Sequence, residues 1–295
     1  MAQASIIDGK QVATDLRNDI KKRVSNLRDR GVTPGLTVII VGEDPASQVY
    51  VRMKARACEK IGIDEHTIEL PADTTEKDLL DLILKLNRNT ECHGILVQMP
   101  LPEHIDPDTI INAIAPGKDV DGLHPTSIGR LVRGQEGFKP CTPYGILKLL
   151  EYYDIETDGK EAVVVGRSDL VGKPIANLLM QKSKYGNATV TLCHTHTQDL
   201  AQHTRRADIL VVAAGVPNAV SADMIKPHAT VIDVGVNRVD APGTEKGYKL
   251  VGDVGFDKAQ HVAGYITPVP GGVGPMTITM LLHNTVWSAE QKLTT

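Results

Sequence analysis

The pattern of apolar and polar positions in the first hundred residues switches between two periods. Residues 36–42 form an almost continuous apolar run of strand length, and residues 9–28 and 45–61 repeat apolar positions at helical spacing. A further helical stripe covers residues 79–86, and an apolar strand is expected at residues 94–98. Because unbroken apolar strands that alternate with helices are typical of parallel sheets covered on both faces, we predict an α/β fold.

The chain between residues 100 and 143 is rich in Pro, Gly, His and Asp, and it predicts a loop-rich connection that contains a domain boundary. Before it, residues 73–76 have capping-box spacing and place a helix start ahead of the apolar stripe. After it, Thr142 and Pro143 have N-cap and first-turn chemistry, which predicts a helix leading into a second domain.

The second half of the chain again alternates strands with helices. Strands are expected at residues 162–165, 188–193, 209–213 and 230–234, with a loop at 166–174 and a helix at 175–181. Such a series predicts a doubly wound parallel sheet, in which ligands bind beyond the carboxyl ends of the strands. A final helical pattern at 276–290 is expected to pack on the first domain.

Length and charge narrow the class of function. A chain of 295 residues with 41% apolar content can form one or two domains with buried cores. The net charge is only -4 and the charges are scattered, so no electrostatic footprint for nucleic acid or for an anionic membrane is present. Small-molecule chemistry is the class that remains.

The sequence also bears on compartment. The four cysteines lie far apart with no C-x-x-C pair, and the first residues show no basic-then-apolar signal pattern. The apolar runs fall far short of the ~20 residues that span a bilayer. We therefore expect a cytoplasmic protein with reduced thiols.

Tyr50 and Lys54 are the first candidate site residues. They are four positions apart in the helix expected at 45–61, so a phenol and an ammonium group project from one face. A surface lysine beside a half-buried tyrosine is the ordinary alternative. Tyr-x-x-x-Lys also occurs in short-chain dehydrogenases, but there it follows a glycine-rich nucleotide loop, whereas here it precedes the nucleotide-type unit.

Three further features stand where a ligand could bind. Gln98 ends an apolar strand and carries an amide that both donates and accepts; a turn-stabilising role is the alternative. Asp121 lies in a loop and could accept two parallel N–H bonds from an amidine-like ring edge, or could form an ordinary Asx-turn. The three glycines within residues 270–275 indicate unusual dihedrals or close ligand approach rather than a free linker.

Residues 166–174 follow a strand and precede a helix, so their amides can face a phosphate at the helix N-terminus. The G-x-G-x-x-G pattern is absent, which leaves the loop a moderate sign of dinucleotide binding. Arg167 supplies a planar cation for a ribose 2'-phosphate, and residues 193–196 offer no acidic residue for ribose hydroxyls, so NADP is favoured over NAD. Cys193, His194 and His196 lack a partner cluster with zinc-site spacing, and no metal is expected.

Taken together, these segments resemble the bifunctional methylenetetrahydrofolate dehydrogenase/methenyltetrahydrofolate cyclohydrolase family along nearly the whole chain. The resemblance rests on the order and spacing of eight motifs, which are Tyr50-x-x-x-Lys54, Gly94-Ile-Leu-Val-Gln98-Met-Pro-Leu-Pro102, Lys118-Asp-Val-Asp-Gly122, Pro140-Cys-Thr-Pro143, Val164-Val-Gly-Arg-Ser168, Val171-Gly172, Val251-Gly-Asp-Val254 and Thr267-Pro-Val-Pro-Gly-Gly-Val-Gly-Pro-Met-Thr277.

The resemblance implies an activity and a set of site residues. The expected activity is oxidation of 5,10-methylenetetrahydrofolate with NADP, followed by hydrolysis of the methenyl product to 10-formyltetrahydrofolate. Lys54 is the implied central catalytic residue, with Tyr50 and Gln98 beside it and Asp121 on the pterin ring. The remaining implied contacts are Pro100, Gly271 and Gly272 for folate, and Gly166, Arg167, Ser168, Thr195 and Val236 for NADP.

The resemblance also implies an organisation. Residues 1–121 with 275–295 are expected to form an N-terminal α/β catalytic domain that binds folate, and residues 140–270 a Rossmann-like doubly wound parallel-sheet NADP domain. A homodimer and a place in one-carbon supply for purine biosynthesis are implied as well. Asp169 departs from the family pattern and adds negative charge near a phosphate site. A dehydrogenase without useful hydrolysis and a non-catalytic nucleotide-binding protein are the alternatives.

Overall fold

The computed structural model describes residues 3–244 and 247–293, and the chain divides into two compact units. The three-stranded unit comprises Thr14–Cys141 and Ile278–Thr295, and the six-stranded unit comprises Met1–Ala13 and Thr142–Thr277. Each unit has its own parallel sheet. The predicted α/β class with two sheet-centred units is therefore confirmed.

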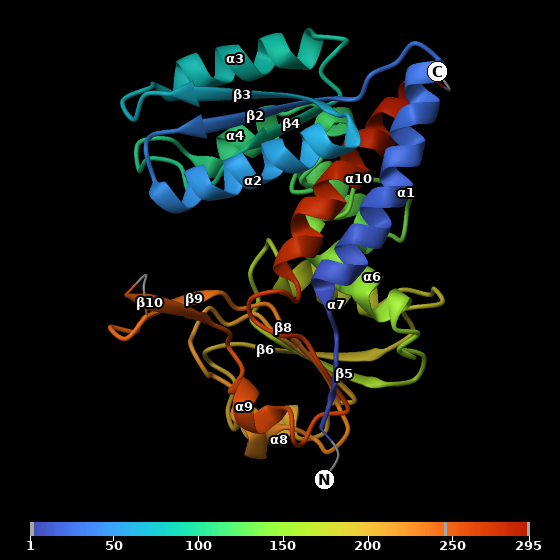
Figure 1. Ribbon diagram of the computed structural model, residues 1–295, viewed down its shortest axis with the longest axis vertical. Helices are drawn as coiled ribbons and strands as arrows, with labels where there is room; N and C mark the ends of the chain where they lie inside the picture. Colours follow the sequence, from blue (N-terminus) through green and yellow to red (C-terminus); the bar gives the residue numbers. More distant parts are fainter. Residues whose placement is uncertain (1–2, 245–246, 294–295) are drawn as a thin grey trace. The chain divides into compact units, whose positions relative to one another are not determined.

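The three-stranded unit has the strand order β3-β2-β4, and both pairings are parallel. Figure 1 shows α2 and α3 on opposite sides of these strands. The elements whose residues lie mainly in this unit are α1 (Gly9–Asp29), β2 (Gly35–Val41), α2 (Pro45–Ile61), β3 (Asp64–Leu70), α3 (Glu76–Arg88), β4 (Gly94–Val97), α4 (Pro107–Ala113), η1 (Pro116–Lys118), α5 (Pro125–Val132) and α10 (Gly274–Lys292).

The core of the three-stranded unit explains why its central strand reads as an unbroken apolar run. Every residue of β2 is buried, because helices cover both faces of the sheet. Ile39 and Val41 pack on α3 and α4 through a cluster that includes Leu79, Ile83 and Ile110. The C-terminal part of α10 is tied to this unit, since Ser288 donates a hydrogen bond to the carbonyl of His93 at 2.7 Å.

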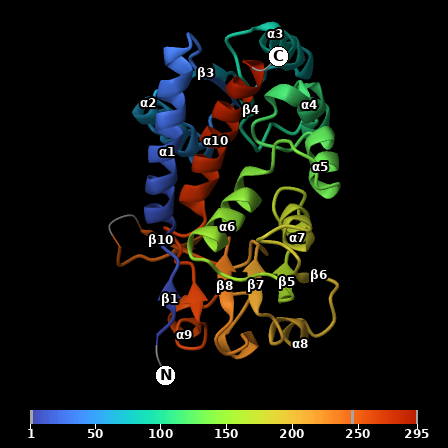
Figure 2. The same ribbon diagram turned by 90° about the vertical axis from the view of Figure 1, so that its right-hand side faces the viewer.

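The six-stranded unit has the order β1-β11-β8-β7-β5-β6, with every neighbouring pair parallel. Figure 2 shows β8, β7 and β5 side by side with their arrowheads pointing the same way. Its elements are β1 (Ser5–Ile6), α6 (Cys141–Tyr152), β5 (Glu161–Val165), α7 (Gly172–Met180), β6 (Thr189–Cys193), α8 (Leu200–Thr204), β7 (Ile209–Val212), η2 (Ala222–Met224), β8 (Thr230–Asp233), β9 (Asn237–Asp240), β10 (Tyr248–Val251), α9 (Phe256–Ala259) and β11 (Tyr265–Ile266).

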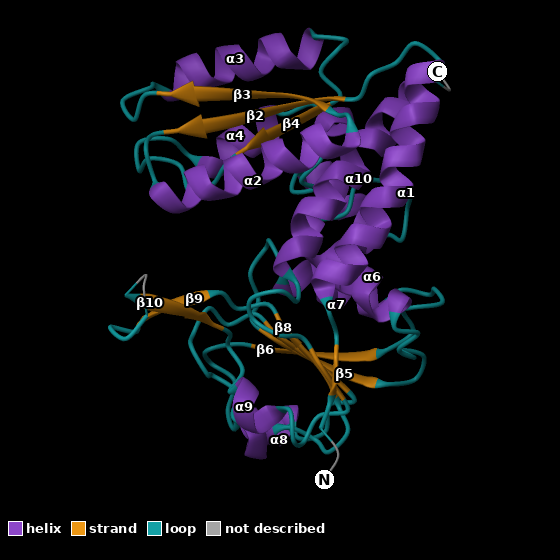
Figure 3. Ribbon diagram, in the orientation of Figure 1, coloured by secondary structure: helices purple, strands orange, loops and turns teal. Residues whose placement is uncertain are grey.

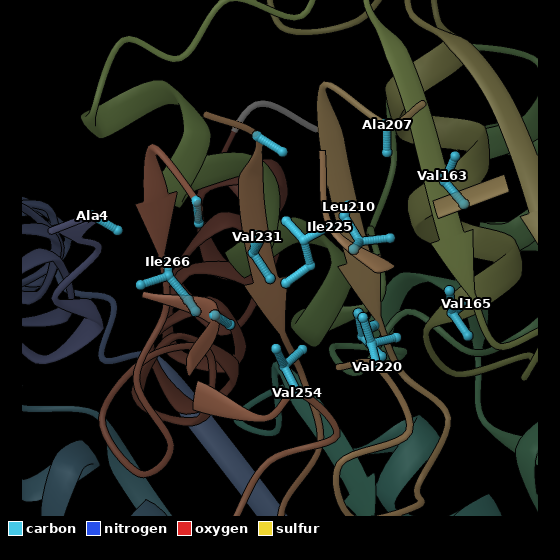
Figure 4. Packing of buried hydrophobic residues seen from close by; sticks show 14 of the residues in the cluster. Ala4, Val163, Val165, Ala207, Leu210, Val220, Ile225, Val231, Val254 and Ile266 are labelled. Carbon is cyan, nitrogen blue, oxygen red and sulfur yellow. The ribbon is translucent and has the colours of Figure 1, made fainter. Parts of the chain in front are cut away.

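Buried aliphatic side chains line one face of the six-stranded sheet. Figure 4 shows Val163, Leu210, Val231 and Ile266 from four adjacent strands within one cluster. Partly buried Leu200 of α8 and Phe256 of α9 pack against the same cluster. Helices α6 and α7 lie on the other side of the sheet (Figure 1), so the predicted doubly wound arrangement is confirmed.

Several elements differ from the sequence-based expectation. The helix predicted from a capping box at residues 73–76 instead begins after Thr75, whose hydroxyl accepts from the N–H of Asp78 at 3.1 Å. The connection at 100–143 is less irregular than expected, because it holds α4, η1 and α5. Figure 3 shows the β9–β10 hairpin as a separate two-stranded ribbon, which apolar periodicity did not predict.

Candidate active site

Helix α2 carries Lys54 into the interior of the three-stranded unit. The helix start is fixed by Asp44, whose carboxylate accepts from the N–H of Ser47 at 2.7 Å, and by Pro45 in the first turn. Lys54 lies ten positions after Asp44 and is only 8% exposed, whereas Tyr50, one turn earlier, is 43% exposed. The predicted i, i+4 pair therefore combines a buried amine with an open phenol.

Gln98 is the hydrogen-bond partner of the buried amine. The ammonium group of Lys54 donates to Oε1 of Gln98 at 2.9 Å. Gln98 directly follows β4, and its own N–H extends the sheet pairing by donating to the carbonyl of Ile39 at 2.8 Å. Its side-chain amide also donates to the carbonyl of Met99 at 2.7 Å, which turns the amide oxygen toward Lys54.

The surroundings of Lys54 favour the neutral amine more than water does. Burial is the largest effect and lowers the pKa of Lys54, because the charged form loses its hydration. The negative charge of Asp121 opposes this and favours the ammonium form. Lys54, Gln98 and Asp121, which come from a helix, a strand end and a loop, are thus brought into one electrostatic neighbourhood.

Cys141 is a site neighbour whose role the sequence did not indicate. Its thiol donates to the carbonyl of Val120 at 3.4 Å, and burial, together with the negative charge of Asp121, raises its pKa well above the ordinary range, so it stays a neutral thiol. Asn284 of α10 donates to the carbonyl of Val120 at 2.8 Å and approaches the sulfur of Cys141 at 3.7 Å. No spacing signal links residues 121, 141 and 284, because the fold alone brings them together.

Asp119 shapes the turn that holds Asp121. Its carboxylate accepts from the N–H groups of Leu123 at 3.1 Å and His124 at 2.9 Å, and from the hydroxyl of Ser127 at 2.6 Å. Burial raises the pKa of Asp119 to about 6, against the lowering effect of these donors. The first aspartate of Lys118-Asp-Val-Asp-Gly122 is therefore a buried structural group, whereas the second is partly exposed.

The other residues expected to contact folate are Pro100, Gly271 and Gly272. Pro100 is exposed in the loop that follows β4. Gly271 and Gly272 belong to the six-stranded unit. Gly271 has a φ of 112°, and a Cβ on Gly272 would lie 2.6 Å from the carbonyl oxygen of Pro268, so local geometry alone accounts for glycine at both positions.

In the six-stranded unit, residues 166–171 form a short loop between β5 and α7. Gly166 ends the strand with a φ of 119°, which only glycine adopts readily. The hydroxyl of Ser168 accepts from the N–H groups of Val171 at 3.2 Å and Gly172 at 3.3 Å, which closes the loop onto the start of α7. The predicted position of this loop, between a strand and a helix, is confirmed.

Basic groups gather at the carboxyl ends of β5 and β6. Desolvation lowers the pKa of His194, and Arg167 and His196 lower it further. The His194 and His196 rings lie 6.1 Å apart, and Thr195 is exposed between them. The lowered pKa favours neutral His194, so the guanidinium group of Arg167 is the permanent charge that this edge of the sheet offers to a phosphate-bearing cofactor.

Asp169, the departure from the family pattern, has a local partner. Its carboxylate lies 2.5 Å from the ammonium group of Lys173, the second residue of α7, and both side chains are exposed. The pair lowers the net negative charge that Asp169 would bring to the loop. Val236, the remaining expected cofactor residue, lies just before β9 and is 48% exposed.

The comparisons with known proteins agree with this arrangement. Residues 7–121 match the catalytic domain of the tetrahydrofolate dehydrogenase/cyclohydrolase family, and residues 140–293 match its NAD(P)-binding domain. The chain belongs to this family. It is 56% identical to the bifunctional protein FolD of Prosthecochloris aestuarii over 286 residues, which cover 96% of this chain and 97% of that protein.

Two solved structures have the same fold over their full length. The bifunctional FolD methylenetetrahydrofolate dehydrogenase/cyclohydrolase of Campylobacter jejuni is 47% identical, with a TM-score of 0.93 over 98% of this chain and 99% of that one. The Trypanosoma brucei enzyme, solved with NADP cofactor and inhibitor, is 42% identical, with a TM-score of 0.94 over 100% of both chains. Membership of the family thus covers both units.

Two further properties of the described residues bear on metals and membranes. Within residues 3–244 and 247–293, no three His, Cys, Asp or Glu side chains come together as a metal-binding group. In the same part of the chain, no helix combines the length and the apolar character that crossing a bilayer needs.

Proposed function

We propose that this chain is a bifunctional enzyme of one-carbon metabolism. It oxidises 5,10-methylenetetrahydrofolate to 5,10-methenyltetrahydrofolate with NADP, and it hydrolyses the methenyl group to give 10-formyltetrahydrofolate. The observation that carries this proposal is the match of both units to one dehydrogenase/cyclohydrolase family, together with a buried lysine held by a glutamine in the catalytic part. We assign residues 1–121 and 275–295 to the folate-binding domain and residues 140–270 to the cofactor domain.

The cofactor domain supplies orientation and charge. Bound NADP provides the nicotinamide ring that accepts the hydride. Gly166, Ser168 and Thr195 would hold the phosphates, and Val236 would limit the space around the cofactor. Arg167 faces the ribose 2'-phosphate, because a guanidinium group pairs with a phosphate through parallel hydrogen bonds.

Lys54 acts as the base of the hydrolytic step. Its lowered pKa makes the neutral amine available, and the cationic methenyl group favours that neutral form further. The amine takes a proton from water as the water oxygen attacks the bridge carbon. Gln98 holds the amine through its 2.9 Å contact, and Tyr50 orders the substrate from the open side of α2.

Asp121 holds the pterin ring through two parallel hydrogen bonds, as a carboxylate does with a guanidinium group. Its neighbour Cys141 stays a neutral thiol, because burial raises its pKa, and so it places no second negative charge beside the carboxylate. Pro100, Gly271 and Gly272 complete the folate contacts. We further propose that the enzyme is cytoplasmic and forms a homodimer. Light scattering of the purified protein would test the homodimer.

The decisive experiment is an absorbance assay with methylenetetrahydrofolate and either NADP or NAD. We expect NADP reduction together with brief formation and decay of the methenyl product. Stable accumulation of that product would instead indicate a dehydrogenase without hydrolysis. No reduction with either cofactor would contradict the proposal.

A further inference from the structure

Two carboxylates are buried side by side at the carboxyl edge of the six-stranded sheet. Asp233 ends β8 and is 3% exposed, and Asp253, which follows β10, is 0% exposed. Burial raises the pKa of Asp233 to about 6, and the charge of Asp253 adds to that rise. Burying two like charges costs free energy, and the hydrogen bonds that both carboxylates accept offset part of that cost.

Asp253 binds two separate segments. Its Oδ2 accepts from the N–H groups of Ala214 at 2.7 Å and Gly215 at 2.8 Å, just beyond β7. Its Oδ1 accepts from the side-chain amide of Asn237 at 2.8 Å, at the start of β9. One carboxylate therefore ties the end of β7 to the hairpin.

Asp233 fixes the backbone on either side of this contact, around Gly235 and around Asp253 itself. Its Oδ1 accepts from the N–H groups of Gly235 at 3.0 Å and Asp253 at 2.9 Å, and its Oδ2 accepts from the N–H of Val254 at 2.9 Å. Gly235 and Asn237 are thus held by the two carboxylates, and Val236 between them is the exposed residue of the segment.

Glycines leave the room that the carboxylates occupy. A Cβ on Gly252 would lie 1.8 Å from Oδ2 of Asp233, and a Cβ on Gly235 would lie 2.2 Å from Cγ of Asp253. Any side chain at either position would displace a carboxylate. The local sequence is therefore adapted to keep both charges inside.

We propose that Asp233 and Asp253 are positioning residues for the cofactor, which fix the Gly215 and Val236 segments at the edge where a doubly wound sheet binds its ligand. They act through the backbone and through Asn237, without contact to NADP. This inference rests on the proposed function, because it takes Val236 as part of the cofactor site.

The test is the Asp253→Asn variant. An amide at this position has one accepting and one donating end, so it cannot accept from both Gly215 and Asn237. We expect the KM and the dissociation constant for NADP to rise on the order of tenfold, since a buried donor is left unpaired. Hydrolysis of supplied methenyltetrahydrofolate, measured without NADP, should stay within about twofold, because the lost contact lies in the six-stranded unit and Lys54 in the three-stranded unit.

An exchange variant provides the rescue. In Asp253→Asn with Asn237→Asp, the amide can accept from Ala214 and Gly215 while it donates to the new carboxylate, so NADP affinity should recover to within about threefold of the wild type. Asn237→Ala, which removes one bond at a half-buried position, should raise the KM for NADP less than Asp253→Asn does. Asp257→Asn, an exposed charge on α9, is the matched control.

The outcomes separate the two proposals. Unchanged NADP affinity in Asp253→Asn and Asn237→Ala would overturn the positioning role. Equal loss of both activities, with no recovery in the exchange variant, would reduce Asp253 to a structural residue and overturn it as well. Failure of the wild type to bind NADP would instead contradict the proposed function.

Discussion

The ammonium group of Lys54 lies 2.9 Å from Oε1 of Gln98, and this contact joins helix α2 to the end of strand β4. Because Lys54 is buried, a single neutral acceptor orients the amine without stabilising its charge as a carboxylate would. The pair is therefore suited to hold an amine that takes and releases a proton.

Replacing Lys54 with alanine should reduce methenyltetrahydrofolate hydrolysis by roughly 100-fold or more, the usual contribution of a positioned base. The decay of methenyl absorbance at fixed pH measures this rate. Lys60→Ala, at an exposed position near the end of the same helix, is the control and should keep the wild-type rate. Hydrolysis by Lys54→Ala at the wild-type rate would show that another group is the base.

Gln98→Glu should move the pH dependence of hydrolysis. In the wild type the rate rises with pH as Lys54 loses its proton, and burial keeps that pKa below its ordinary value. A carboxylate at position 98 favours the ammonium form, so the rising limb should move to higher pH. Gln98→Met carries no charge and should produce no upward movement. If the rate of hydrolysis rises over the same pH range in Gln98→Glu and in the wild type, deprotonation of Lys54 does not control that rate.

Two residues of this site can be predicted from the sequence, because Lys54 lies within a helix with clear apolar periodicity and Gln98 follows the end of an apolar strand. The helix at 45–61 agrees with α2, and the strand expected at 94–98 ends beside Gln98, so periodicity and turn chemistry suffice to place both residues. The proximity of Lys54 to Asp121 does not follow from spacing. It depends on tertiary packing between α2 and a loop 67 positions further along the chain.

The elements that sequence reasoning missed are short or polar. β3 lies at a sheet edge and has only two apolar residues, Ile68 and Leu70, and β9 and β10 are strands of four residues that pair outside the two larger sheets. Such strands carry little apolar signal, because their burial is partial. The burial of the carboxylates of Asp119 and Asp233 is also not evident from the sequence, because tertiary packing produces it. The backbone donors to Asp119 follow it closely in the chain, whereas Asp233 accepts from backbone N–H groups about 20 positions away.

Asp121→Asn should raise the KM for folate in both reactions by about tenfold or more, because a charge-assisted pair of hydrogen bonds to the pterin is weakened. The dissociation constant for NADP, measured in the absence of folate, should stay at the wild-type value. Initial rates across folate concentrations for each reaction provide the measurement. Wild-type KM values in both reactions would remove Asp121 from the folate site.

Arg167→Ala should change cofactor choice. Without the guanidinium group, the KM for NADP should rise by roughly tenfold or more, while the KM for NAD, which lacks the 2'-phosphate, should change little. Asp169→Asn is the informative comparison, because Lys173 already pairs with that carboxylate and only a small gain in NADP affinity is expected. An equal rise of both KM values in Arg167→Ala would indicate general damage to the loop.

The stability of the three-stranded unit should depend on pH through Asp119. Its pKa in the folded state is about 6, above the ordinary 3.8, so the folded state binds this proton more tightly than the unfolded state. The contribution of this group to the free energy of unfolding is therefore greatest below about pH 4 and is lost as pH rises through about 6. Asp119→Asn does not titrate and supplies the reference.

Denaturant unfolding at a series of pH values between about 4 and 7 would measure this effect. On lowering the pH across that range, the wild type should gain about 2 kcal/mol relative to Asp119→Asn. Asp108→Asn, an exposed aspartate in α4, is a suitable second control, because loss of a solvated charge leaves the pH dependence like that of the wild type. A constant difference between the wild type and Asp119→Asn would mean that this carboxyl group titrates alike in both states, and that its three hydrogen-bond donors fully offset its burial.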